Sequence, residues 1–185
     1  YGDPVLFIDL GGYASSKSGG SRAGQWMLLK QAFDEAELKS GDDGDGVLTR
    51  AGRAALKRLG DGGKVVFGVN RASDILQALA FAKRRNLDAI ISGGAEAWLV
   101  ADRLASAGVP VMLDPLQNLP SSFDSLGSRL DNAALLHAAG VTVIVDEAGS
   151  HNARKLRQMA GNAAANGLDH EAALAALTIN PAKAF

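Results

Sequence analysis

The sequence of 185 residues contains no cysteine, which excludes disulfide bonds, thiolate nucleophiles and cysteine-ligated zinc. No apolar run approaches the roughly 20 residues that span a bilayer, and no basic-then-apolar signal pattern follows Tyr1. The formal net charge is only −1 and no block of Lys and Arg stands out, so we expect neither a nucleic-acid nor a membrane partner. A chain without cysteine suits cytosolic and exported compartments, which leaves the localisation open. Because it starts without Met, we expect a processed chain or a fragment.

The proportions of hydrophobic and charged residues favour one folded domain. Hydrophobic residues make up 47% of the chain and charged residues 21%, which suffices for one sizeable core. We therefore expect a single α/β domain over residues 1–185.

Apolar stretches typical of buried strands alternate with stretches of helical periodicity. The expected strands are 5–10, 64–70, 89–92, 109–114 and 141–146, and the expected helices are 26–38, a helix capped by Thr49, 72–85, 95–107, 131–139, 152–166 and 170–177. This alternation predicts a parallel sheet covered by helices. Five strands are too few for a closed eight-stranded barrel of about 250 residues, so periodicity alone favours an open doubly wound sheet.

Two glycine-rich segments are candidate ion-binding loops. Residues 40–46 are acidic, but no Glu follows at the twelfth position of a calcium loop, so a surface loop is the favoured interpretation. Residues 11–24 lead into a helix N-terminus and could cradle an anion, yet they lack the Gly-Lys-Ser/Thr of a phosphate loop. A flexible loop is favoured there too.

Five short motifs carry a resemblance to a known family. They are Asn70–Leu79, Ser92–Trp98, Asp114–Pro120, His151–Arg154 and Leu177–Pro181. In this order they resemble the segments after strands five to eight, and the closing helix, of imidazolonepropionase-like members of the amidohydrolase superfamily. The match is best over residues 64–185 and looser before them.

The resemblance implies the C-terminal portion of a TIM-like (β/α)₈ metal-dependent hydrolase barrel, with residues 5–10 as strand four. Such a portion leaves sheet edges open, because strands one to three are missing. We therefore expect a partner chain, a homo-oligomer or further sequence to cover these edges.

The resemblance also implies hydrolysis of a C–N bond in a cyclic amide or peptide-like small molecule, with zinc as the family's metal. The family's ligands are a His-x-His pair after strand one, a Lys or Glu near strand four, histidines ending strands five and six, and an Asp ending strand eight. Here Gly68 stands at the strand-five position, and residues 91–94 contain no histidine. Only Asp146 matches one of these positions, where it would be a metal ligand or a general base. Because Glu147 is adjacent, either of the two acids could occupy this position. The metal site is therefore expected to be degenerate.

Four residues at predicted strand ends are candidate substrate-binding groups, namely Asn70, Arg71, Glu96 and His151. Each has a structural alternative. Arg71 begins a helix, where its charge opposes the dipole, and Asp74 is the expected local partner. Glu96 can form a structural salt bridge instead.

For His151 the alternative is a helix N-terminus, because Ser150 or Asn152 can cap the following helix. The other histidines, His137 and His170, lie in predicted helices and have no ligand pattern. Ser150 and His151 are adjacent in sequence and no nucleophile elbow surrounds them, which argues against a serine hydrolase. Three hypotheses remain: a C–N hydrolase with its missing ligands outside this chain, a metal-free and catalytically inert binding or structural module, and an open α/β sheet that binds a small ligand.

Overall fold

The computed structural model describes residues 4–12, 14–37, 46–117, 119–147 and 150–185. Its elements are β1 (Val5–Asp9), η1 (Ala14–Ser18), α1 (Arg22–Glu37), α2 (Arg50–Leu59), β2 (Lys64–Val69), α3 (Ala72–Arg84), β3 (Asp88–Gly93), η2 (Ala97–Val100), α4 (Ala101–Ala107), β4 (Val111–Leu113), α5 (Asn132–Ala138), β5 (Val143–Val145), η3 (Ser150–Lys155), α6 (Leu156–Ala165), α7 (His170–Leu177) and α8 (Ile179–Ala184). The η elements are 3₁₀ helices.

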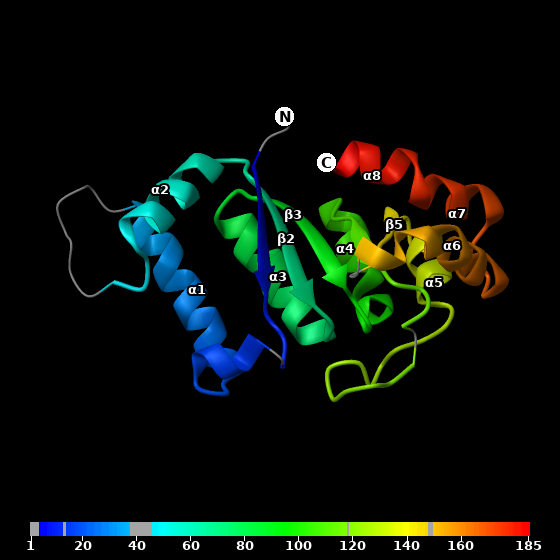
Figure 1. Cartoon of the computed structure of the whole chain (residues 1–185), viewed down its shortest axis with the longest axis horizontal. Helices are drawn as coiled ribbons and strands as arrows, with labels where there is room; N and C mark the ends of the chain where they lie inside the picture. Colours follow the sequence, from blue (N-terminus) through cyan, green and yellow to red (C-terminus); the bar gives the residue numbers. More distant parts are fainter. Residues whose placement is uncertain (1–3, 13, 38–45, 118, 148–149) are drawn as a thin grey trace.

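The five strands form one parallel sheet in the order β1-β2-β3-β4-β5. Helices separate successive strands, as Figure 1 shows. A doubly wound sheet reverses its strand order at a switch point, and this order has no reversal. The open doubly wound sheet favoured by periodicity alone is therefore wrong, while the parallel α/β architecture and the five expected strands are confirmed.

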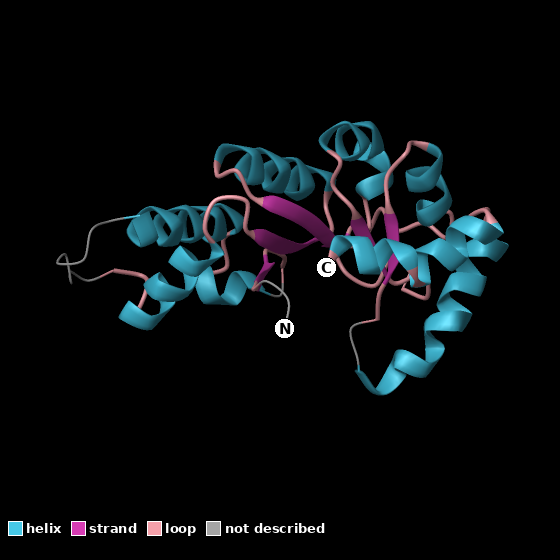
Figure 2. Ribbon diagram, turned by 90° about the horizontal axis from the view of Figure 1, so that it is seen from above, coloured by secondary structure: helices cyan, strands magenta, loops and turns pink. Residues whose placement is uncertain are grey.

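The two faces of the sheet bury different partners, because successive side chains of a strand point to opposite faces. One face carries Val65, Phe67 and Ile91, which pack with helix residues such as Phe81 and Leu104 in the main core. Figure 2 shows the corresponding row of helices along one side of the strands. The opposite face carries a smaller apolar cluster, made of Val66, Ile90, Met112 and Ile144 together with Ala184 of α8.

Local signals at the helix ends are confirmed in part. Thr49 caps α2, because its Oγ1 accepts a hydrogen bond from Gly52 N at 3.1 Å. The helix expected from residue 152 instead begins as η3 and becomes α6 at Leu156. The residue preceding α6 is Lys155, which makes no side-chain cap, and Asn152 Nδ2 donates to Glu147 Oε1 at 3.2 Å. Because the side chain of Ser150 lies outside the described residues, its capping role stays a prediction.

Both ends of the sheet lack a neighbouring strand among the described residues, at β1 on one side and β5 on the other. That a partner chain, a homo-oligomer or further sequence covers these edges remains a prediction. Within the described ranges, no helix combines the length and the apolar character needed to cross a membrane.

Candidate binding site at the carboxyl ends of the strands

Strand register brings polar side chains together at the carboxyl end of the sheet. Asp9 of β1 lies opposite Gly68 of β2, and Gly68 lies opposite Ser92 of β3. Asp114 and Asp146 each come two residues after the paired residues Met112 and Ile144, which places them at the same end of the face that carries Val66 and Ile90. In parallel sheets covered by helices, ligands bind at this end of the strands.

A cleft of about 270 Å³ opens beside β4 and β5, and we call it the acidic cleft. Its lining residues are Asn70, Ser92, Gly93, Ala95, Met112, Leu113, Asp114, Gln117, Ser121, Ser122, Ser125, Ser128, Asn132 and Asp146. Two carboxylates belong to this set, and the described lining includes no Lys, Arg or His. The cleft therefore presents net negative charge and many hydrogen-bonding groups.

A larger groove of about 630 Å³ lies beside β1 and β2. Its lining residues are Asp9, Gly11, Gly12, Ala14, Gly68, Asn70, Ser92, Gly93, Ser122, Phe123 and Asp124. Asn70, Ser92, Gly93 and Ser122 line both hollows. The groove and the acidic cleft thus form one continuous polar rim across the sheet.

Asp146 lies where the sequence places it, directly after β5 and in the lining of the acidic cleft. Its backbone N–H donates to Leu113 O at 2.8 Å, which ties the residue to the end of β4. The side chain is half-buried. Within the described ranges, however, no group of three or more His, Cys, Asp or Glu residues could hold a metal ion. The described residues therefore do not fit a catalytic metal on their own.

Gly68, for which the sequence resemblance implies the strand-five position, lies against a carboxylate. A Cβ added at Gly68 would lie 2.2 Å from Asp9 Oδ1, far inside contact distance. Any side chain at this position would require Asp9 to move. The space beside Gly68 is therefore occupied by the carboxylate at the end of the neighbouring strand.

Asn70 and Glu96 are engaged in holding the loops after β2 and β3. Asn70 Oδ1 accepts from Ala95 N at 3.3 Å, and Asn70 lines both hollows. Glu96 Oε2 accepts from Ala72 N at 2.9 Å, at the first residue of α3. Glu96 thus satisfies a free backbone N–H at a helix start, and it is absent from the lining of both hollows.

Arg71 does not take the expected partner. Its Nε lies 3.7 Å from Asp124 Oδ1, and its guanidinium donates to Phe123 O at 2.8 Å. Asp74 forms its ion pair with Arg22 instead. The expectation that Asp74 partners Arg71 is wrong, because Asp74 lies within reach of a cation that is 52 residues distant in sequence.

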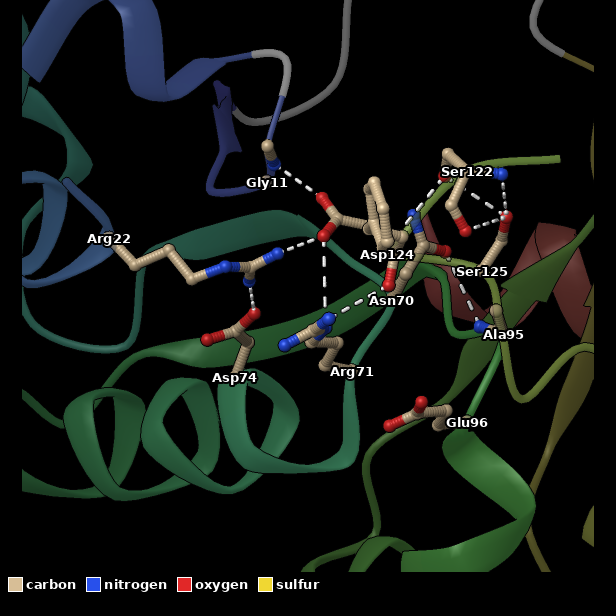
Figure 3. Close-up of polar contacts among 12 residues, drawn as sticks. Gly11, Arg22, Asn70, Arg71, Asp74, Ala95, Glu96, Ser122, Asp124 and Ser125 are labelled. Carbon is tan, nitrogen blue, oxygen red and sulfur yellow. Dashed lines mark hydrogen bonds and ion pairs between the residues drawn. The ribbon is translucent and has the colours of Figure 1, made fainter. Parts of the chain in front are cut away.

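Arg22 joins two carboxylates, as Figure 3 shows, by hydrogen bonding to both Asp74 and Asp124. Asp124 also accepts from the backbone of Gly12. We call Arg22, Arg71, Asp74 and Asp124 the ion-pair cluster. Burial raises the pKa of the Asp74 carboxyl, whereas the Arg22 guanidinium opposes that rise. The cluster fastens the loop after β1 and the loop after β4 to α3.

Several residues considered in the sequence analysis cannot be placed in a site, either because they lie outside the described part of the chain or because they lie within helices. His151 lies in η3, but its side chain, like that of Ser150, is outside the described part of the chain. Most of the acidic loop, residues 38–45, is also outside it, so the calcium alternative stays a sequence interpretation. His137 lies in α5, and His170 begins α7 after the Asp169 cap, as expected for helix residues.

The sequence interpretation missed several rim residues, among them Asp9, Asp114, Asp124, Ser128 and Asn132. For Asp9 and Asp114 a signal existed, because alternation along each strand places them on the same face as Phe7 and Met112. Asp124 and Ser128 lie in the loop between β4 and α5, and Asn132 is the first residue of α5. All three reach the rim because this segment folds back over it. No periodic pattern in the sequence predicts that this segment folds back.

Comparison with solved structures finds an amidohydrolase from Thermotoga maritima MSB8 that matches with a TM-score of 0.81 and 22% sequence identity. The match covers 96% of this chain and 50% of that one. The fold is amidohydrolase-like. No family model matches the sequence, and no curated protein does. This chain thus spans half the length of its structural neighbour and has the fold of part of a TIM-like barrel.

Proposed function

We propose that the chain forms the substrate-binding part of an amidohydrolase-like hydrolase that cleaves a C–N bond in a cyclic amide or peptide-like small molecule. The observation that carries the proposal is the continuous polar rim at the carboxyl ends of all five strands. Barrel enzymes keep their sites at this end. The imidazolonepropionase-like subfamily is part of the proposal and rests on the sequence motifs.

Within this proposal, Asp146 has the catalytic role. Its half-buried carboxylate lines the acidic cleft, where it would accept a proton from an attacking water or bind a metal. Asn70 would orient a polar substrate group, because it lines both hollows. Arg71 would support substrate binding by holding the loop that contains Asp124, and Glu96 would do so by holding the start of α3. Further metal ligands would come from outside these 185 residues, and His151 is proposed as a substrate contact on sequence grounds alone.

A second function is favoured by one specific observation. Asp9 Oδ1 fills the space beside Gly68. The sequence resemblance implies that the family carries a metal-binding histidine at this position. Additional sequence could not restore that ligand without displacing Asp9. A metal-free, catalytically inert binding or structural module is therefore the alternative proposal.

Two measurements on the purified full-length protein separate these functions. The first is the zinc and manganese content, and the second is hydrolysis of dipeptides and five-membered cyclic amides with and without added zinc. The hydrolase proposal expects turnover that is lost in Asp146→Asn and retained in Asp102→Asn, a matched exposed carboxylate on α4. Stoichiometric metal would overturn the inert module, and no turnover of that full-length protein under either condition would overturn the hydrolase proposal.

A further inference from the structure

The acidic cleft contains two buried polar atoms without hydrogen-bond partners among the described residues. They are Ser128 Oγ and Asn132 Oδ1, and both residues line this cleft. Asn132 is 2% exposed, and an amide oxygen this deeply buried is normally hydrogen-bonded. A buried polar atom without a partner costs free energy, so a hydrogen-bonding group bound in this cleft would be stabilised by two such atoms.

The orientation of the Asn132 amide is fixed by its other end. Its Nδ2 donates to Gly94 O at 2.9 Å. Turning the amide over would set Oδ1 against a carbonyl oxygen, and two acceptors repel each other. The unpaired atom is therefore a hydrogen-bond acceptor, and it needs a donor.

The charges around the cleft select which donor. Asp114 Oδ1 accepts from Leu116 N at 2.9 Å, which leaves its second oxygen available. Within the described part of the chain, no hydrogen bond or ion pair involves the Asp146 carboxylate. The cleft lining adds no positive side chain. A group that donates several hydrogen bonds and carries positive charge matches both the acceptors and the negative charge of this lining.

We propose that the acidic cleft binds the protonated amino group of a small ligand, with Asn132 Oδ1, Asp114 and Asp146 as acceptors and Ser128 Oγ as a neutral contact. The inference rests on the proposed function only in placing a ligand at this rim. It adds a substrate class, since a peptide-like substrate of this protein would present a primary amine to β4 and β5. Binding alone tests it, whether or not the chain catalyses hydrolysis.

The test compares three five-carbon probes that differ in their end groups: pentane-1,5-diamine, pentane-1,5-diol and glutarate. Binding of each to the whole chain is measured by isothermal titration calorimetry at pH 7 and low salt. We expect the diamine to bind about tenfold or more tightly than the diol, because charge-assisted hydrogen bonds are the strong ones, and glutarate to bind most weakly. Added salt should weaken the diamine alone.

Variants assign the binding to the cleft. Asp114→Asn and Asp146→Asn should each weaken the diamine by about fivefold or more, with little change for the diol. Ser128→Ala should weaken it slightly and leave the fold intact, because it deletes a hydroxyl that has no partner. Asp102→Asn and Ser106→Ala, on the exposed side of α4, are the matched controls and should change nothing.

Three results would overturn the proposal. They are equal affinity for diamine and diol, preference for glutarate, and diamine binding that survives both Asp114→Asn and Asp146→Asn. Failure here with retained hydrolysis would leave the proposed function standing. Diamine binding without hydrolysis would instead support the cleft and reject the enzyme.

Discussion

The two sides of the polar rim handle charge in opposite ways. On the side of β1 and α3, every carboxylate of the ion-pair cluster has a guanidinium partner, since Asp74 and Asp124 both bond to Arg22. On the side of β4 and β5, the carboxylates of Asp114 and Asp146 line a cleft without a cation among its described residues. Charges that are paired and half-buried fix structure, whereas charges left unpaired in a hollow are available to a ligand. The ion-pair cluster therefore stabilises the structure, whereas the acidic cleft is available to bind a ligand.

The same loop serves both sides. Residues 121–128 contribute Asp124 to the ion-pair cluster, and Ser122, Ser125 and Ser128 to the acidic cleft. Trp98 holds the end of this loop, because its Nε1 donates to Gly127 O at 2.9 Å. Breaking the cluster should therefore loosen the cleft wall, while emptying the cleft of charge should leave the cluster intact.

The largest effect is expected from Arg22→Met. This change leaves Asp74, whose side chain is 5% exposed, without its cation. We expect a loss of about 2 to 3 kcal/mol in the free energy of unfolding, less than for a fully buried pair because Arg22 is itself partly exposed. Urea denaturation measures it. Arg103→Met on α4 removes an exposed Arg as the control, and an equal loss in both variants would show that the cluster fastens nothing.

A smaller effect is expected at Gly68, between the two sides of the rim. Gly68→Ala should cost about 1 kcal/mol, because the new Cβ meets Asp9 Oδ1 and forces that side chain aside. In an Asp9→Ala background the cost should disappear, so a double-mutant cycle on thermal unfolding measures the coupling directly.

The control for Gly68→Ala is Gly161→Ala in α6. An added Cβ there meets no atom within 4 Å, so this variant should gain about 0.5 to 1 kcal/mol from helix propensity. A Gly68→Ala cost that persists without Asp9 would place the strain in the backbone and contradict the steric account.

The smallest effect is a pH dependence within the ion-pair cluster. Burial raises the pKa of Asp74 in the folded state above its ordinary value of about 3.9. The folded protein therefore holds this proton more tightly than the unfolded chain, and the resulting stabilisation is lost as the pH rises through the folded-state pKa. Arg22→Met removes the opposing cation, so its unfolding free energy should fall more steeply with rising pH than that of the wild type.

Chemical denaturation between pH 4 and pH 8 checks this slope, with Asp74→Asn as the variant that lacks the titrating group. If the unfolding free energies of the wild type and Arg22→Met changed with pH in parallel, Arg22 would have no effect on the titration of Asp74.

The sequence predicted the fold better than the site, for physical reasons. The apolar strands and the Thr49 cap are local signals, and both appear in the structure. Strand order depends on crossovers that periodicity does not encode, so only the resemblance to amidohydrolases indicated a barrel-like order. The partner of Arg71 was predicted wrongly because a residue three positions away seemed sufficient, whereas the structure supplies Asp124 from a distant loop. Asn132 was missed because no local pattern in the sequence indicates that the segment leading into α5 folds back over the rim.

The most direct test of the division between fastening and binding site compares Asp124→Asn with Asp146→Asn, by unfolding free energy and by diamine affinity. Each change removes one carboxylate charge and keeps the side-chain size. We predict that Asp124→Asn lowers the free energy of unfolding by about 1 to 2 kcal/mol, since it deletes an ion pair to Arg22. Asp146→Asn should stay within about 0.5 kcal/mol of the wild type and weaken diamine binding about fivefold or more. Equal destabilisation by both variants, or diamine binding unaffected by Asp146→Asn, would contradict this account.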